Sequence, residues 1–120
     1  MKALANTVVI TGSTSGLGRA TALACLRRGG NVVVSSENAL ALEETREAFV
    51  EFGDRVAGML CDTRSWSQVE ALLDLALQHY GSIDCWINNA GATAPSGDAA
   101  LVPQASGESL INVNILGTYN

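Results

Sequence analysis

A glycine-rich stretch near the start of the chain constrains the fold more than any other feature. The letters TGSTSGLG, residues 11–18, directly follow the apolar run TVVI and lead into a helical pattern. Glycine has no Cβ, so it allows a tight turn and a close approach of the backbone to phosphate oxygens. The start of a helix presents unpaired N–H groups and a partial positive charge. The stretch therefore predicts a strand-to-helix turn that binds a dinucleotide pyrophosphate through main-chain amides.

The composition is that of a globular protein that does not bind nucleic acid. The 120 residues are 48% hydrophobic and 16% charged, and seven Lys and Arg against twelve Asp and Glu give a formal net charge of −5. Such a chain repels a polyanionic backbone, so a nucleotide must be held by backbone dipoles. No apolar run approaches the roughly 20 residues of a membrane span, and no secretory signal is visible. We expect a soluble intracellular protein, located in the cytoplasm.

The three cysteines indicate neither a disulfide framework nor a metal site. Cys25, Cys61 and Cys85 are odd in number, and none has CxxC spacing or a nearby histidine. A disulfide framework is expected to have an even number of cysteines, and a zinc site is expected to have CxxC spacing or a nearby histidine. We expect reduced, packed thiols and no bound metal.

Strand and helix patterns alternate along the chain. Apolar, β-branched runs predict strands at residues 7–10, 31–35, 55–61 and 83–88. Helical periodicity predicts helices at residues 16–28, 38–53 and 65–81. This βαβαβαβ order with short connections predicts a doubly wound, parallel α/β sheet of the Rossmann type.

The helices carry start, stop and packing signals. In the first, one apolar stripe is expected to contain Leu17, Ala20, Ala24 and Cys25. The second is expected to begin after a cap at Asn38 and to end at Gly53. The third is expected to begin with a capping box of Ser65 and Gln68 and to end at Gly81. Its core stripe is expected to contain Val69, Leu72, Leu73, Ala76, Leu77 and Tyr80.

Two motifs together make the pattern specific. The TGxxxGxG turn is matched, after the fourth expected strand, by the letters NNAG at residues 88–91. The chain resembles the N-terminal half of the short-chain dehydrogenase/reductase family over essentially all 120 residues. The pair Asp62-Thr63 and the letters VNILG at residues 113–117 resemble two further family segments. With Trp86 in its fourth strand, the chain looks most like the chlorophyll(ide) b reductase branch, although core filling also explains this Trp.

The resemblance implies an NAD(P)-dependent oxidoreductase that moves a hydride between a nicotinamide and a carbonyl or alcohol substrate. The implied cofactor-binding residues are Gly12, Ser13, Thr14, Ser15, Gly16, Leu17, Gly18, Asp62, Thr63, Asn89, Ala90 and Gly91. Asp62 would accept a hydrogen bond from the adenine amino group, and a plain capping carboxylate is the alternative. Asn89 to Gly91 would contact the cofactor ribose, and a plain turn is the alternative. Asn114 would take the family's proton-relay position.

Glu37, just past the second strand, is expected to set the choice between NAD and NADP. It follows Gly18 by 19 residues, close to the interval at which an acidic residue binds the adenine-ribose hydroxyls of NAD. Neither Ser15 nor residues 35–38 supply a positive charge for the 2′-phosphate of NADP. We therefore expect a preference for NAD, the alternative being that Glu37 simply points into solvent.

The family's other catalytic residues are not in this sequence. The only lysine is Lys2, and neither Tyr80 nor Tyr119 has a lysine four residues later. We expect residues 1–120 to be the N-terminal portion of an NAD(P)-binding domain, truncated before the Tyr-x-x-x-Lys region and inactive alone. The full-length parent would be the enzyme. The alternative is a non-catalytic dinucleotide-binding or interaction module.

The resemblance also has consequences for assembly and location. In the family's strand order, 3-2-1-4, the fourth strand of this chain would be an open edge, which invites pairing with another chain. Members of the family commonly pair through later helices, so the resemblance leaves both a monomer and a homo-oligomer open for the parent protein. If the chlorophyll(ide) branch is correct, the plastid stroma replaces the cytoplasm as the expected location.

Overall fold

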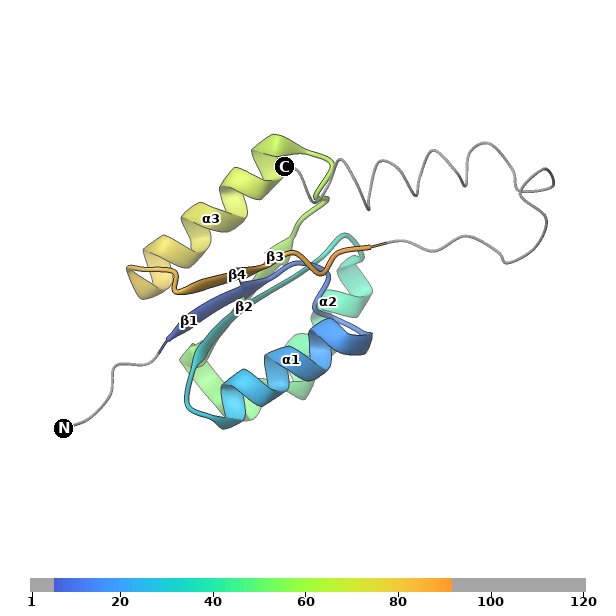
Figure 1. The fold of residues 1–120 in the computed structure, drawn as a ribbon. Helices are drawn as coiled ribbons and strands as arrows, with labels where there is room; N and C mark the ends of the chain where they lie inside the picture. Colours follow the sequence, from blue (N-terminus) through green and yellow to red (C-terminus); the bar gives the residue numbers. More distant parts are fainter. Residues whose placement is uncertain (1–5, 92–120) are drawn as a thin grey trace.

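A parallel sheet lies between two layers of helices. The computed structural model describes residues 6–91, and Asn114 therefore lies outside the described residues. The strands are β1 (Thr7–Ile10), β2 (Asn31–Ser36), β3 (Val56–Leu60) and β4 (Cys85–Ile87). They pair in the order β3-β2-β1-β4, all parallel (Figure 1). The predicted fold class and strand order are confirmed.

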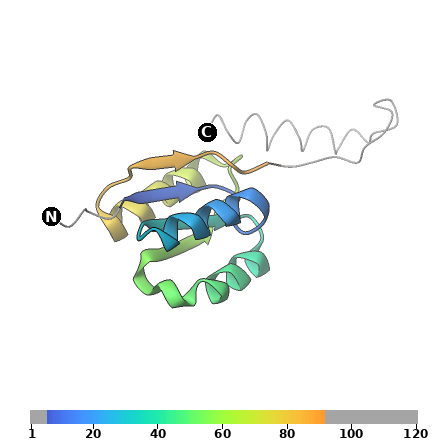
Figure 2. The ribbon, with the colours of Figure 1, turned by 60° about the horizontal axis from the view of Figure 1, so that its bottom comes forward.

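The helices cover both faces of the sheet. They are α1 (Gly16–Arg27), α2 (Ala39–Ala48), the 3₁₀ helix η1 (Val50–Arg55) and α3 (Trp66–Tyr80). The pair α1 and α2 lies on one face and α3 on the other (Figures 1 and 2). No helix among residues 6–91 is long and apolar enough to cross a membrane.

Alternate residues of β2 supply both halves of the core. Val32 and Val34 are buried on the side of α1 and α2, and Val33 is buried on the side of α3. Burial on both faces is why β2 is an uninterrupted β-branched run rather than an alternating one. The other buried residues beneath α1 and α2 are Ile10, Ala22, Leu26, Leu42 and Phe49. Those beneath α3 are Val9, Cys61, Leu72 and Ala76.

The apolar stripes predicted for two helices are partly wrong. The buried face of α1 consists of Gly18, Ala22 and Leu26, whereas Leu17 is 76% exposed. Gly18 and Ala22 are small enough to let α1 pack closely on the sheet, and Leu26 completes this buried face. On α3, Leu72 and Ala76 are buried, but Leu73 and Leu77 remain 39% and 42% exposed.

The predicted second helix is two elements. The Asn38 side chain caps α2 as expected, accepting a hydrogen bond from the Ala41 amide at 3.0 Å. However, α2 ends at Ala48, and η1 contains Gly53 at a φ of 56°. The tighter turn brings the rings of Phe49 and Phe52 into edge-to-face contact, 6.2 Å between centroids. The helix type therefore changes where the two aromatic rings meet.

The cap of α3 also differs from the predicted box. Ser65 accepts from the Gln68 amide at 3.4 Å, as expected. The Gln68 side chain instead accepts from the Asp62 amide at 2.7 Å, because the Ser65 amide already donates to the Asp62 carbonyl oxygen. Gln68 thus holds the backbone of Asp62, two residues after the end of β3. Gly81 ends the helix in the left-handed conformation, as predicted.

Candidate dinucleotide-binding site

The turn between β1 and α1 requires glycine at two positions for its backbone conformation. Gly12 has a φ of +64° and Gly16 a φ of +56°, and side chains disfavour this region. These two glycines reverse the chain at the carboxyl end of β1 and start α1 directly above the sheet. The turn lies at the edge where ligands bind in parallel α/β folds.

A second reason for glycine is the close approach of the NNAG segment. A Cβ on Gly12 would lie 2.8 Å from the Cα of Ala90. One on Gly18 would overlap the side-chain amide of Asn89 and lie 2.8 Å from the Gly12 carbonyl oxygen. That Asn89 amide donates to the same carbonyl at 3.1 Å. The two motifs, far apart in the sequence, therefore form one unit.

Thr11 joins these motifs. Its hydroxyl oxygen accepts from the amides of Asn89 and Ala90, both at 3.0 Å, and the hydroxyl donates to the Ile87 carbonyl at 3.4 Å. Our sequence analysis did not assign Thr11 to the site. The one sequence feature that could have indicated this role is a hydroxyl-bearing residue between the end of β1 and the first glycine of the turn.

Ser13 fixes the turn to the neighbouring strand. It is fully buried, donates to the Ile10 carbonyl at 2.8 Å and accepts from the Ser35 amide at 3.0 Å. Its own amide donates to the Ser35 carbonyl at 2.9 Å. The structure thus places the Ser13 hydroxyl inside the protein, where it holds the turn rather than facing the cleft.

The first turn of α1 presents its main chain to this edge. Ser15 is the N-cap residue but makes no side-chain cap hydrogen bond, and the first turn has no acidic residue. Helix N-terminal amides left without a cap can bind an anion. The Leu17 side chain points into solvent, so only its main chain can serve such a ligand.

A cleft of about 410 Å³ opens beside the turn. The predicted site residues that line it are Gly12, Thr14, Ser15, Glu37, Thr63, Asn89, Ala90 and Gly91. The structure adds Ser36, Asn38, Ala41 and Cys61. The predicted residues that do not line it are Ser13, Gly16, Leu17, Gly18 and Asp62. Gly16 and Gly18 shape the turn without lining the cleft. Asp62 is linked to Glu37 by one residue that contacts both carboxylates.

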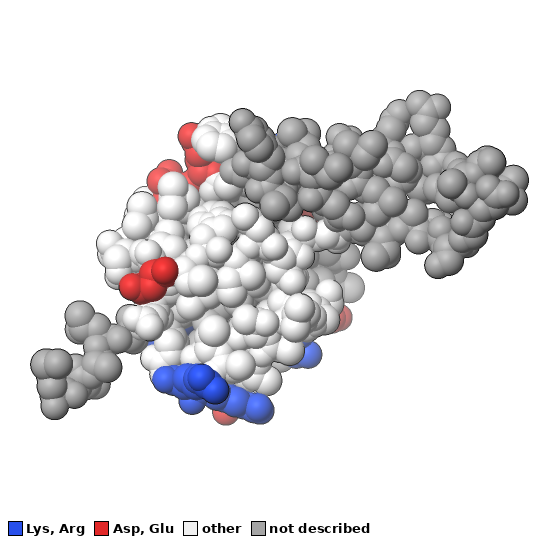
Figure 3. Space-filling view, in the orientation of Figure 1, with Lys and Arg blue, Asp and Glu red and all other residues white. Residues whose placement is uncertain are grey.

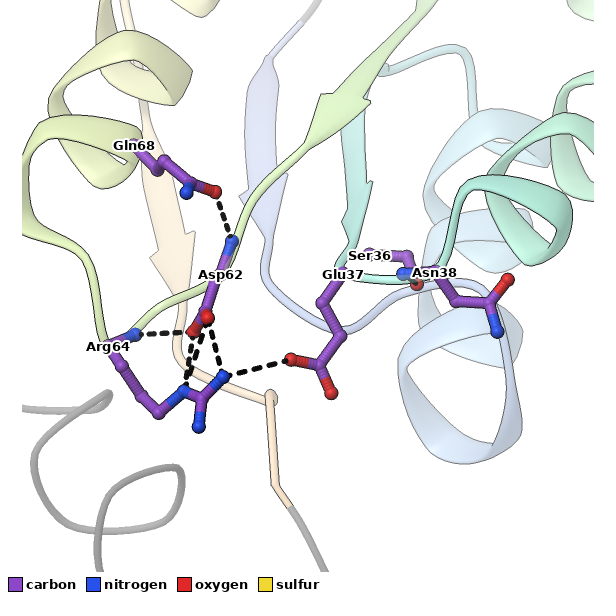
Figure 4. Close-up of polar contacts among 6 residues, drawn as sticks. All are labelled: Ser36, Glu37, Asn38, Asp62, Arg64 and Gln68. Carbon is purple, nitrogen blue, oxygen red and sulfur yellow. Dashed lines mark hydrogen bonds and ion pairs between the residues drawn. The ribbon is translucent and has the colours of Figure 1, made fainter. Parts of the chain in front are cut away.

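That shared partner is Arg64. Its guanidinium binds Asp62, with 2.7 Å between Nη2 and Oδ2, and lies 4.0 Å from Glu37 Oε2 (Figure 4). The Arg64 hydrogen bonds hold the pKa of the Asp62 carboxyl below its usual value, against the desolvation that raises it. Asp62 in turn raises the pKa of Arg64. Both groups therefore stay charged at neutral pH.

Cys61 is buried where β3 ends. Burial, together with the nearby Asp62 charge, raises the pKa of the thiol to about 11. A neutral thiol is a poor nucleophile, so Cys61 contributes packing and shape to the cleft. Cys85, in contrast, is exposed, which corrects the expectation that all three thiols are packed.

Basic side chains lie mostly away from the cleft. Figure 3 shows arginine side chains gathered at the end of the molecule where α1 ends. Arg19, one turn into α1, lies over the Phe49 ring at 5.6 Å. The Tyr80 hydroxyl donates to the Asp54 carbonyl at 2.9 Å, at the amino end of the strands and therefore away from the cleft. An anion at the glycine turn would therefore meet main-chain amides rather than cations.

Known proteins share the sequence pattern. The model of the short chain dehydrogenase family matches residues 6–120. A curated relative, chlorophyll(ide) b reductase NOL of rice (Oryza sativa subsp. japonica), is 45% identical over 91 residues, 74% of this chain and 26% of the relative. That similarity supports the branch indicated by the strand with Trp86. The chain spans only about a quarter of this relative's length.

Solved structures share the architecture. A short-chain dehydrogenase/reductase of Burkholderia phymatum in complex with NAD superposes with a TM-score of 0.88 at 31% identity. The match covers 96% of this chain and 41% of that one. A variant of actinorhodin polyketide ketoreductase with NADPH gives 0.86 at 29% identity, covering 96% and 44%. The chain therefore belongs to the short-chain dehydrogenase family.

Proposed function

We propose that the chain is the cofactor-binding half of an NAD(P)-dependent oxidoreductase that interconverts a carbonyl and an alcohol. The observation that carries this is the unit formed by the glycine turn and the NNAG segment. Thr11 and Asn89 lock the two motifs together at the carboxyl edge of the sheet. Superposition on family members that hold NAD or NADPH supports a dinucleotide at the same edge.

In this proposal, backbone groups do the binding. The amides at the start of α1 hold the pyrophosphate, and the Asn89-Ala90-Gly91 backbone contacts the cofactor ribose. When bound, the nicotinamide supplies or accepts the hydride. The chain's own contribution is to hold the dinucleotide in one orientation, because a fixed geometry is a large part of the rate enhancement in such reactions.

The adenosine end would select the cofactor. Glu37 lines the cleft just after β2, where a carboxylate accepts hydrogen bonds from the ribose hydroxyls of NAD. The same carboxylate would repel a 2′-phosphate. We therefore propose that NAD is preferred over NADP, with Asp62 and Thr63 beside the adenine.

Catalysis would need residues outside those described. Asn114 is proposed for the relay position, and the proton donor would come from a longer protein, as would the substrate pocket. Without a positioned proton donor, rates fall by about 10²–10⁴-fold, so residues 1–120 alone are expected to be inactive. The compartment, cytoplasm or plastid stroma, stays a prediction of the sequence.

Titration of the chain with NADH and NADPH tests the proposal. Nucleotide fluorescence should rise on binding, and NADH should bind with the lower Kd. Replacing Glu37→Arg should shift the ratio of the two dissociation constants toward NADPH by about tenfold or more. A folded chain that binds neither nucleotide would contradict the proposal. Binding without any hydride transfer by the longer protein would instead favour a non-catalytic dinucleotide-binding module.

A further inference from the structure

Arg64 places a positive charge at the adenosine end, where the sequence led us to expect only carboxylates. It belongs to the connection between β3 and α3, and its 40% exposed side chain extends toward Glu37 (Figure 4). Glu37 follows β2 and Asp62 follows β3, and these two strands are paired in the sheet. The guanidinium therefore bridges the ends of two neighbouring strands.

Asp62 anchors this guanidinium. Oδ1 accepts from the Arg64 amide at 3.0 Å and from Nε at 2.9 Å. Oδ2 accepts from Nε at 3.2 Å and from Nη2 at 2.7 Å. A carboxylate has about four lone-pair sites, so Arg64 occupies most of the acceptor capacity of Asp62. Asp62 thus holds the cation in place, with the same Nη2 atom 4.0 Å from Glu37 Oε2.

The contact with Glu37 is looser. The two side chains are 40% and 62% exposed, and their charged atoms are 4.0 Å apart. Exposed ion pairs of this kind stabilise a protein little, so another anion can replace Glu37 at small cost. A guanidinium suits a phosphate well, because its planar N–H groups match the phosphate oxygens.

The charges of Glu37, Asp62 and Arg64 determine whether a 2′-phosphate would be repelled or bound. Glu37 and Asp62 alone would present two negative charges to a group that itself carries about −1.5 to −2. Arg64 compensates one of them, and a 2′-phosphate would take the place of Glu37 beside its guanidinium. We propose that Arg64 is a specificity-determining residue that admits the 2′-phosphate of NADP, so that the site prefers NAD yet also binds NADP. This inference rests on the proposed function.

Adenosine nucleotides that lack the nicotinamide half isolate this effect. The probes are 5′-AMP and adenosine 2′,5′-bisphosphate, titrated into the chain by calorimetry, with circular dichroism confirming that each variant folds. Arg64→Gln should raise the Kd of the bisphosphate about tenfold and change that of 5′-AMP by less than about twofold. Arg64→Lys, which keeps the charge without the planar donors, should give an intermediate bisphosphate Kd. Glu37→Gln should lower the bisphosphate Kd.

Three outcomes would overturn the inference. If Arg64→Gln weakens both probes equally, Arg64 only positions Asp62 for the adenine. If it weakens neither, the cation does not reach the phosphate. In both cases binding of 5′-AMP by the wild-type chain leaves the proposed function standing. If the folded wild-type chain binds neither probe, the proposed function fails and the inference fails with it.

Discussion

The two ends of the parallel sheet are built in opposite ways. At the amino end of the strands, side chains close the structure. Arg55 donates to the carbonyls of Leu26 and Gly30 at 2.8 and 3.0 Å. Asp84 accepts from the Thr7 amide at 2.7 Å. At the carboxyl end, the first turn of α1 has neither a side-chain cap nor an acidic residue.

This contrast separates groups that stabilise the fold from groups that can bind a ligand. Backbone polar groups need partners, and at the amino end Arg55, Asp84 and Tyr80 provide them. At the carboxyl end Gly12, Thr14 and Ser15 line the cleft, and α1 begins beside it without a side-chain cap, so a ligand can bind the amides of its first turn. Substitutions at the amino end should therefore change stability alone, and those at the carboxyl end should also change binding.

The largest effect is expected from a matched pair of glycine substitutions. Both Gly12 and Gly81 have positive φ, +64° and +77°, but only at Gly12 would a Cβ meet another atom, 2.8 Å from Ala90 Cα. A strained φ costs about 1–3 kcal/mol, and the clash at Gly12 also displaces the NNAG segment. Gly12→Ala should raise the Kd for NADH by about 100-fold or more.

Gly81→Ala is the control. It should lower the free energy of unfolding by about 1–3 kcal/mol, measured by urea denaturation, and leave the NADH Kd unchanged. Equal loss of NADH affinity in the two variants would show that the ends of the sheet do not differ in this way.

Removal of the Thr11 hydroxyl should have the next largest effect. Thr11→Val leaves the amides of Asn89 and Ala90 without their acceptor, and an unsatisfied buried donor costs about 1–3 kcal/mol. Both the free energy of unfolding and NADH affinity should fall. Thr21→Val is the matched variant, because the Thr21 hydroxyl donates to the Leu17 carbonyl of its own helix. If Thr11→Val behaves like Thr21→Val, the connection between the two motifs is not needed.

At the amino end, Arg55→Met should affect stability only. The substitution removes the donors to Leu26 and Gly30, and a hydrogen bond contributes about 0.5–1.5 kcal/mol. Urea denaturation should show a loss of about 1–2 kcal/mol, with NADH affinity retained. A weaker NADH affinity in a folded Arg55→Met variant would mean that this end influences the cleft.

The smallest effect concerns pH. The folded pKa of Cys61 is raised to about 11 from an ordinary 9.0. The folded chain therefore holds a proton that the unfolded chain loses. Its contribution to stability is complete below about pH 9 and is lost as the pH rises toward 11. Cys61→Ala should flatten the fall in unfolding free energy over this interval, whereas Cys85→Ala should not. Identical slopes for wild type and Cys61→Ala would contradict the raised pKa.

Local signals explain why much of the fold could be predicted. Asn38, Ser65 and Gly81 end or begin helices through contacts within a few residues. The β-branched run of β2 reflects burial on both faces. The end of α2 could not be predicted, because it depends on how the Phe49 and Phe52 rings pack on the core.

The site was predictable where glycine and backbone form it, and not where side chains reach across the fold. The turn and the NNAG segment are recognisable from their letters alone. Arg64 acquires its place only when β2 pairs with β3, which brings Glu37 beside Asp62. Thr11 acquires its role only when β4 pairs with β1. Such contacts depend on strand order rather than on spacing along the chain.

The central claim is that main-chain amides at the carboxyl end bind the pyrophosphate. Glycine-selective ¹⁵N labelling makes both ends visible in one NMR titration with NADH. We expect the amide signals of Gly12, Gly16 and Gly18 to shift with occupancy, while those of Gly29, Gly53 and Gly81 stay in place. Shifts confined to the second group, or absent from the first at saturation, would contradict the account.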